Sequence, residues 1–560
     1  MNQTNNTQKS LKGNSIIIDP QASNSDLEEI LTSRFEDEWS IHTNINDLYD
    51  PYLLKDMDKL VQRVTQAKNN NEKVVIFWDY DVDGVTSTSL LVHLFKKLGI
   101  LVSYRLPHRV HDGYGLKKYF IDELKALDVD LIITVDCGSR DREIVRYAQD
   151  LWLDTIITDH HHVPADMPLE AIAFINPNRP DCDYPDKNLA GAWVAFKIVL
   201  ALARKFFPDT AQQYITESID IAAIGTVADC MQLVGENRII VQEGLKQIKS
   251  SRSRGIRSLI EEKIHEDIDA DIFGFQIGPR LNAAGRMDSP YKALNLILNN
   301  SEGVFDTLRE IEELNTLRKE KSLAHTQIAH DNIAPNDNMI MYDSPDIEHG
   351  IIGIVAGRLT ETYYKPSIVL KDEGDKFVAS CRSPDYFSLI GILEKYKAYF
   401  IAYGGHKNAA WFSISKEQFP LFRKAIMSEM QSYDFSTYTQ EIYVDAFVRL
   451  DEIGWKLLDI QNTFRPYGMG NPKPLYLIEK FIPEKISILG KKSRDHVSFE
   501  NRYGFKIFGF FLWEFFEELN FHLKKAKKWE NDGFSLIVDI SEDNFNGQRG
   551  IMLKVIDVVI

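Results

Sequence analysis

The chain has 560 residues and a formal net charge of −17, with 44% hydrophobic and 26% charged residues. A chain of this length exceeds what one hydrophobic core organises, so several domains are expected. The negative charge argues against a uniformly basic, polyanion-binding surface, although a nucleic-acid enzyme needs only one positive channel. Two basic clusters, at 491–494 and 522–529, occur late in the chain.

The composition predicts a cytoplasmic protein without a membrane segment. No apolar run approaches the roughly 20 residues that cross a bilayer. The polar residues 1–15 are expected to form a flexible tail and contain no signal-peptide core. The cysteines are widely separated, which fits a reducing compartment and argues against a zinc ribbon or a disulfide framework. They are Cys137, Cys182, Cys230 and Cys381.

Strands and helices alternate through the first half of the chain. Apolar runs rich in β-branched residues predict strands at 74–78, 101–106, 131–135 and 154–158. Helical spacing predicts helices at 86–98, 116–127, 141–150, 190–206 and 211–225. This alternation is typical of a parallel, doubly wound α/β sheet. A charged pattern without proline over 301–332 predicts a long connecting helix.

The pattern changes after Pro335. Short strands predicted at 339–343, 367–372 and 376–383 indicate a smaller α/β domain. Alternating patterns from residue 440 onward indicate a β-rich domain, expected to be a small barrel. We therefore predict five segments: an N-terminal tail and lead-in (1–50), a parallel-sheet domain (51–300), a connecting helix (301–335), a second α/β domain (336–438) and a terminal β domain (439–560).

Three carboxylates at alternate positions stand in the hexapeptide DYDVDG at 79–84. This spacing opens a calcium loop of the EF-hand type, and it also fits a metal cluster at the end of a strand. The calcium loop requires a helix before it and a carboxylate at its twelfth position. Here the preceding segment has a strand pattern and the twelfth position is Leu90. The sequence therefore favours the metal cluster.

Further metal-binding side chains follow two other predicted strands. Asp136 follows the strand at 131–135, and Asp159 and His160 follow the strand at 154–158. The carboxyl ends of parallel strands share one edge of a sheet, where ligands bind. Carboxylates gathered there repel one another unless cations neutralise them. Oxygen ligands mixed with imidazole suit Mn²⁺ or Mg²⁺ better than zinc thiolate chemistry.

The ordered motifs resemble those of the DHH phosphoesterase superfamily. DYDVDG, VDCG (135–138) and DHH (159–161) carry the resemblance, and GTVAD (225–229) is similar to its fourth acidic motif. Five further motifs resemble those of the superfamily's exonuclease branch. They are GPRLNAAGRM (278–287), HGIIGIVAGRL (349–359), SCRS (380–383), GGH (404–406) and RPYGMGNPKP (465–474). This resemblance implies a DHH domain, a connecting helix, a DHHA1-type domain and a terminal domain like an OB fold.

The resemblance also implies which residues form the site. Two divalent ions, Mn²⁺ or Mg²⁺, would be held by Asp79, Asp81, Asp83, Asp136, His160 and Asp229. Asp136 would bridge the ions, and His161 would face the scissile phosphate. Either Asp79 or Asp83 could brace a neighbouring side chain instead of contacting a metal. Substrate would contact Arg109, Arg280, Ser380, Arg382, Gly405 and His406. Cys381 and Trp411 stand where the family commonly has glycine.

By this resemblance the protein would be a 5′→3′ exonuclease specific for single-stranded DNA that hydrolyses phosphodiester bonds with two metals. It would act as a monomer in DNA repair and recombination, with a single-strand-binding protein and a recombination helicase as partners. One alternative is a DHH oligoribonuclease or 3′-phosphoadenosine phosphate phosphatase, which is usually shorter and lacks a region after about residue 440. A second, a non-catalytic relative, would have lost acidic ligands that are present here.

Overall fold

A computed structural model describes residues 9–20, 22, 26–35, 38–106, 115–263, 268–334, 337–489, 496–510, 533–545 and 548–559. Arg109 and the basic clusters at 491–494 and 522–529 lie outside these ranges. The chain divides into two compact units. One contains Thr43–Tyr433 with Gly468–Gly470, and the other contains Met1–His42, Asp434–Tyr467 and Asn471–Ile560. Within the described ranges, no helix is both long and apolar enough to span a membrane.

The first sheet is fully parallel and has the strand order β3-β2-β4-β5-β6. Its strands are β2 (Lys73–Trp78), β3 (Leu101–Arg105), β4 (Leu131–Val135), β5 (Asp154–Thr158) and β6 (Ala173–Ile175). The first strand of this sheet, β2, lies between β3 and β4, so the chain winds outward from it in both directions. Doubly wound sheets bind ligands beyond the carboxyl ends of their strands at such a switch point.

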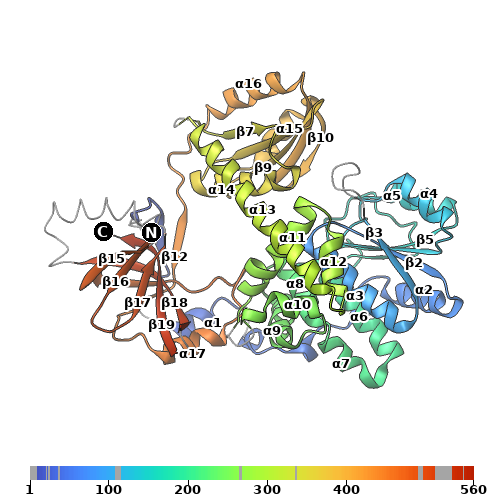
Figure 1. Cartoon of the computed structure of the whole chain (residues 1–560), viewed down its shortest axis with the longest axis horizontal. Helices are drawn as coiled ribbons and strands as arrows, with labels where there is room; N and C mark the ends of the chain where they lie inside the picture. The colour runs from blue at the N-terminus through green and yellow to red at the C-terminus, as the bar shows by residue number, and fades with distance from the viewer. Residues whose placement is uncertain are drawn as a thin grey trace. The chain divides into compact units, whose positions relative to one another are not determined.

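Helices cover both faces of this sheet (Figure 1). Alternate side chains of β2 point to opposite faces of the sheet. Val74 and Ile76 belong to one hydrophobic core, and Val75 and Phe77 belong to another. The first core includes α2 (Met57–Asn70), α3 (Val82–Leu98) and α6 (Gly191–Phe206), and the second includes α4 (Lys118–Ala126) and α5 (Arg142–Asp150). The predicted doubly wound sheet is therefore confirmed.

Further helices complete this part of the unit. They are α7 (Ala211–Thr216), α8 (Ile219–Ala228), α9 (Gly235–Gln247), α10 (Arg254–Leu259), a π-helix (Ile272–Ile277), α11 (Gly278–Met287), α12 (Tyr291–Leu298) and α13 (Val304–Asp331). The long helix α13 matches the predicted connecting helix. Two predictions need correction: α3 begins at Val82, four residues before the predicted start, and the single helix predicted over 211–225 is two helices, α7 and α8.

A second sheet has the order β10-β11-β9-β8-β7. Its first two strands in the chain, β7 and β8, are parallel, and its other pairs are antiparallel. The strands are β7 (Ile340–Ser344), β8 (Ser367–Asp372), β9 (Lys376–Arg382), β10 (Phe400–Gly405) and β11 (Ala409–Ser415). The helices of this domain are α14 (Ile352–Tyr363), α15 (Leu389–Lys395) and α16 (Phe419–Met430), which confirms a smaller α/β domain.

The other compact unit is rich in strands. Its main sheet has the order β13-β14-β18-β19-β17-β16-β15, and no pairing between β13 and β15 closes it among the described residues. These strands are β13 (Ala446–Phe447), β14 (Tyr476–Phe481), β15 (Lys485–Leu489), β16 (His496–Glu500), β17 (Lys506–Gly509), β18 (Phe534–Phe545) and β19 (Gln548–Val559). A parallel pair, β1 (Ser15–Ile18) with β12 (Glu441–Val444), draws part of the N-terminal lead-in into this unit.

Candidate metal centre

The turn from β2 into α3 carries the carboxylates of DYDVDG. Asp79 follows β2 directly and is buried. Asp81 is the N-cap of α3, and its Oδ1 accepts a hydrogen bond from the amide of Gly84 at 3.1 Å. A capping side chain satisfies an amide that the helix leaves unpaired and fixes the start of the helix. The turn therefore holds its carboxylates at the carboxyl end of the sheet.

Asp83 is buried in the first turn of α3 and is bound by the start of α6. Its Oδ2 accepts a hydrogen bond from the amide of Gly191 at 2.6 Å, and its Oδ1 accepts one from Ala192 at 2.7 Å. Amides at a helix N-terminus favour a negative charge. The same Oδ2 lies 3.7 Å from Nε2 of His160. Asp83 therefore ties two helices together at the edge of the cluster.

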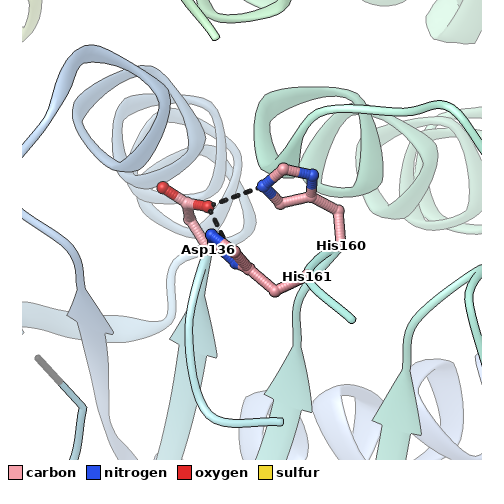
Figure 2. Close-up of side chains that lie close together, drawn as sticks. All are labelled: Asp136, His160 and His161. Carbon is pink, nitrogen blue, oxygen red and sulfur yellow. Dashed lines mark ion pairs between the residues drawn. The ribbon is translucent and has the colours of Figure 1, made fainter. Parts of the chain in front are cut away.

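Asp136, His160 and His161 converge from the ends of β4 and β5 (Figure 2). Oδ1 of Asp136 lies 3.1 Å from Nε2 of His160 and 3.8 Å from Nδ1 of His161. The backbone of Asp136 has a left-handed φ of 59°. Aspartate tolerates this conformation better than most residues. The strand end thus places a buried carboxylate between two imidazoles.

Asp229 reaches the same cluster from the end of α8. It is the C-cap of that helix, and its Oδ2 lies 3.5 Å from Nε2 of His160. Three groups of residues could each hold a metal ion, because within each group the ligand atoms lie within 4.8 Å of one another: Asp79 with Asp81 and Asp136, Asp83 with His160 and Asp229, and Asp136 with His160 and His161. All six predicted ligands fall in these groups, and two of the groups share Asp136.

Three carboxyls of the cluster, those of Asp83, Asp136 and Asp229, have raised pKa values. Burial, together with the negative charge of Asp81, raises the pKa of Asp83 to about 7. Burial and the charges of Asp83 and Asp81 raise the pKa of Asp229 to about 9. The pKa of Asp136 is raised well above its usual range by burial and by the charge of Asp83. Such carboxyls hold protons more tightly than free carboxyls do, unless cations neutralise the cluster.

His161 is oriented by Asp159, which is buried at the end of β5. Oδ1 of Asp159 lies 2.8 Å from Nδ1 of His161 and accepts hydrogen bonds from the amides of His160 and His161. Burial lowers the pKa of His161, but the hydrogen bond and charge of Asp159 outweigh this effect and raise the pKa to about 9. The ring is therefore a hydrogen-bond donor at neutral pH.

The donor set fits hard divalent cations. Nε2 of His160 and Oδ2 of Asp229 are buried atoms that make no hydrogen bond to the described part of the chain. Buried polar atoms are otherwise almost always hydrogen-bonded, so these two are suited to a metal. Burial and the charge of His161 lower the pKa of His160 to about 4, which keeps its imidazole in the neutral form that binds metals. Oxygen and imidazole donors suit Mn²⁺ or Mg²⁺.

Arg280, one of the residues expected to contact substrate, is engaged with protein groups. It lies on α11, and its Nε forms an ion pair with Oε1 of Glu312 on α13 at 2.9 Å. Its Nη1 also donates a hydrogen bond to the carbonyl oxygen of Leu259 at 3.0 Å. A phosphate would therefore have to compete with Glu312 for this guanidinium.

Four other expected substrate contacts gather on the second sheet. Ser380 and Arg382 lie on β9, and Nη1 of Arg382 donates a hydrogen bond to Oγ of Ser380 at 3.2 Å. Gly405 ends β10 with a φ of 138°, and the amide of His406 donates a hydrogen bond to the carbonyl oxygen of Ala409. The SCRS and GGH motifs therefore belong to the same sheet.

Sequence reasoning missed two supports of the cluster. Asp159 was expected only as the residue before the paired histidines, whereas it orients His161. Its place between a buried strand and two histidines was the available signal. The amides of Gly191 and Ala192, which bind Asp83, lie 108 and 109 residues further along the chain and carry no local signal.

Three family models match successive parts of the chain. The DHH family N-terminal domain matches residues 73–226, the DHHA1 domain matches residues 336–432 and the RecJ OB domain matches residues 444–557. The first match contains the parallel sheet together with five of the six predicted metal ligands; Asp229 lies just beyond it. Fold and site together define a metal-binding phosphoesterase of the DHH class.

Relatives narrow the class. The chain is 32% identical over 451 residues to the single-stranded-DNA-specific exonuclease RecJ of Escherichia coli. This match covers 76% of this chain and 78% of the relative. The corresponding Bacillus subtilis protein is 34% identical over 472 residues, covering 82% of this chain, but the chain spans only 58% of that relative's length. The chain belongs to the RecJ family.

Solved structures agree with this assignment. The structure of RecJ from Thermus thermophilus in complex with Mn²⁺ matches with a TM-score of 0.79 and 25% identity, covering 95% of this chain and 76% of that one. A structure of exonuclease RecJ bound to manganese matches with a TM-score of 0.60 and 30% identity, covering 68% of this chain and 96% of that one. Both structures are of manganese complexes, and manganese is one of the two metals that the donor set favours.

Proposed function

We propose that this chain removes nucleotides from the 5′ end of single-stranded DNA in a metal-dependent hydrolysis. The observation that carries the proposal is the convergence of three ligand groups in one buried cluster, with Asp136 in two of them. The names of the Escherichia coli and Bacillus subtilis relatives, single-stranded-DNA-specific exonuclease, support the substrate.

The proposed metal ligands are Asp79, Asp81, Asp83, Asp136, His160 and Asp229. Asp136 and His160 each belong to two ligand groups, and Asp136 is assigned as the bridge because a carboxylate has two oxygens that can bind two ions, whereas one imidazole nitrogen binds one. Two divalent ions, Mn²⁺ or Mg²⁺, would lower the pKa of the attacking water and neutralise charge on the attacking and leaving oxygens. Both oxygens of Asp83 accept backbone hydrogen bonds. Asp83 would therefore hold its orientation before and after metal binding.

His161 is proposed to stabilise the negative charge that develops on the scissile phosphate. Asp159 holds its Nδ1 at 2.8 Å and favours the protonated ring. The proton on Nε2 can then be donated to a phosphoryl oxygen. Water attacks phosphorus in line, the bond from phosphorus to O3′ breaks, and the shortened strand keeps a 5′-phosphate. No nucleophilic serine or cysteine takes part.

The remaining segments are proposed to hold the strand. Ser380, Arg382, Gly405 and His406 would contact backbone phosphates from the domain at 336–438, with Arg109 and Arg280 adding contacts from the domain at 51–300. Arginine suits this role because its planar fork pairs with two phosphate oxygens. The segment at 439–560 would bind further nucleotides, as OB folds do, by stacking and backbone charge.

The biological setting belongs to the same proposal. A single-strand exonuclease of this kind would act in DNA repair and recombination, as a cytoplasmic monomer. A single-strand-binding protein and a recombination helicase are the proposed partners, because each supplies or exposes the single strands that the enzyme would degrade.

An end-labelling assay tests the proposal. Single-stranded DNA labelled at the 5′ or the 3′ end is incubated with the purified protein and Mn²⁺ or Mg²⁺, beside a blunt duplex, short RNA and an EDTA control. We expect early release of the 5′ label as a mononucleotide from the single strand alone. Early release of the 3′ label would reverse the polarity, and cleavage confined to short RNA would favour an oligoribonuclease.

A further inference from the structure

An exposed tryptophan stands in the middle of the sheet that carries the SCRS and GGH motifs. Trp411 on β11 pairs with Ser380 on β9 on one side and with Gly404 on β10 on the other. Directly paired residues of antiparallel strands point to the same face of a sheet. The indole therefore shares a face with Ser380, and it is 48% exposed.

The neighbours of Trp411 leave its ring open. On the same face of β11, two residues away in either direction, stand Ala409 and Ser413, which are both small. A Cβ at Gly404 would lie only 3.2 Å from Nε1 of Trp411, so the indole lies across the glycine. A larger residue at Gly404 would push the ring away. The result is a flat aromatic surface held by backbone, with no large side chain beside it on β11.

The helix on this face does not extend over the indole. Val369 of β8 pairs with Ser380 and lies in the core formed with α14. In the next strands of the same row, Ser380 is partly buried and Trp411 is exposed. Burial therefore falls along the row from β8 to β11. The bare part of the face begins beside Ser380.

A cationic group borders the indole. Arg382 pairs with Ala409, so Arg382 is a diagonal neighbour of Trp411. Diagonal neighbours in a sheet lie about 7–8 Å apart, a distance that long side chains can span. Its guanidinium donates to Oγ of Ser380 and to the carbonyl oxygen of Cys381, and it forms no ion pair with a carboxylate of the described chain. A half-buried arginine without an acidic partner is suited to an anion.

We infer that Trp411 stacks on a nucleobase of the bound single strand while Ser380 and Arg382 hold an adjacent phosphate. This inference rests on the proposed function and adds a base contact to it. An indole suits the role because every base has a π-face, so stacking binds single strands without selecting a sequence. The ligand of this surface is a single-stranded nucleic acid, because Arg382 and Ser380 suit a phosphate and the exposed indole of Trp411 suits an unpaired base.

Binding measurements in EDTA separate this contact from hydrolysis. Fluorescence anisotropy compares oligo(dT) with an abasic strand of equal length and charge, for the wild-type protein and for Trp411→Ala and Trp411→Phe. We expect Trp411→Ala to weaken binding of oligo(dT) by about 5- to 150-fold, the range for one stacked base. Binding of the abasic strand should stay unchanged, and Trp411→Phe should be intermediate. The control is Trp152→Ala, since Trp152 is 89% exposed on the other sheet domain.

Two outcomes overturn the assignment. Equal loss of affinity for both strands in Trp411→Ala would mean that the indole acts on the fold or the backbone, and unchanged affinity for oligo(dT) would mean that it touches no base. A wild-type protein that neither binds nor hydrolyses single strands would overturn the proposed function as well. The circular dichroism spectrum and Tm of each variant establish that it is folded.

Discussion

The carboxylate of Asp136 and the imidazole of His160 meet at 3.1 Å, although each side chain follows a different strand. Their meeting depends on the parallel pairing of β4 with β5, which brings the carboxyl ends of both strands to one edge. A contact of this kind between a buried carboxyl and a neutral imidazole is the core of the proposed metal centre.

Replacing Asp136 with asparagine should remove the metal response without harming the fold. The pKa of Asp136 is raised well above its usual range by burial and by the charge of neighbouring carboxylates, so a neutral asparagine of nearly the same shape relieves that repulsion. Asparagine also tolerates the left-handed φ of 59°. We expect the free energy of unfolding without metal to change by less than about 1 kcal/mol. Hydrolysis should fall by more than about 100-fold.

Thermal unfolding with and without Mn²⁺ provides the matched measurement. Saturating metal stabilises a protein that binds it only when folded, by about 2.7 kcal/mol at 100 times the dissociation constant. The wild-type Tm should therefore rise with Mn²⁺, and the Tm of Asp136→Asn should not. Equal increases in both proteins would show that Asp136 is not a ligand.

Metal binding should release protons near neutral pH. The pKa is raised to about 7 for Asp83 and to about 9 for Asp229, so these carboxyls carry protons that a cation must displace. The affinity for Mn²⁺ should therefore fall as the pH is lowered from 8 to 6, by up to about tenfold per pH unit for each proton released. Titration calorimetry in buffers of different ionisation enthalpy measures the proton count, and a count of zero would contradict the expectation.

The same pKa shifts make the free energy of unfolding of the metal-free protein depend on pH. Because these carboxyls hold protons more tightly in the folded than in the unfolded chain, folding is favoured at low pH, and stability falls as the pH rises from about 4, the ordinary carboxyl pKa, until the folded-state values of about 7 and 9 are passed. Tm measured in EDTA should fall over this range. Mn²⁺ should restore more stability at the upper end than at the lower end.

Replacing Gly84 with alanine should disturb the turn that carries the carboxylates. An added Cβ would lie 2.3 Å from the carbonyl oxygen of Asp79, a backbone atom that cannot move without shifting the turn. Overpacking of this kind costs about 1–3 kcal/mol in the free energy of unfolding. Affinity for Mn²⁺ should fall with it. Gly357→Ala on α14 is the control, because no atom lies within 4 Å of its added Cβ.

Replacing Arg382 with glutamine should weaken strand binding through the backbone. One lost phosphate contact should reduce the slope of log affinity against log salt by about 0.7. The loss should be equal for strands of any sequence. Arg423→Gln is the matched control, since Arg423 forms a half-exposed surface pair with Asp343 that contributes about 0–1 kcal/mol. An unchanged salt slope in Arg382→Gln would exclude a phosphate contact.

The parts of the site that follow strands were predictable from sequence. Asp79, Asp136 and His160 each come just after a short apolar run, and such runs form buried parallel strands whose ends share an edge. The connecting helix α13 was predictable for a similar reason, because a long charged pattern without proline has few alternatives to a helix.

The remaining parts depend on distant pairing that leaves no local pattern. Nothing near Asp83 indicates that the amides of Gly191 and Ala192 will bind it. Likewise, β1 pairs with β12 across more than 400 residues, and its short apolar run looks like part of a lead-in. The earlier start of α3 has a local cause that spacing alone did not weigh, since Asp81 caps the helix.

Anomalous diffraction from crystals soaked in Mn²⁺ tests the central claim most directly. If one buried cluster holds two metals through a shared carboxylate, two peaks about 3.5–4 Å apart should flank the side chain of Asp136. One peak should adjoin Asp79 and Asp81, and the other should adjoin His160 and Asp229, as the ligand groups divide. A single peak, or two peaks that do not both contact Asp136, would contradict the account.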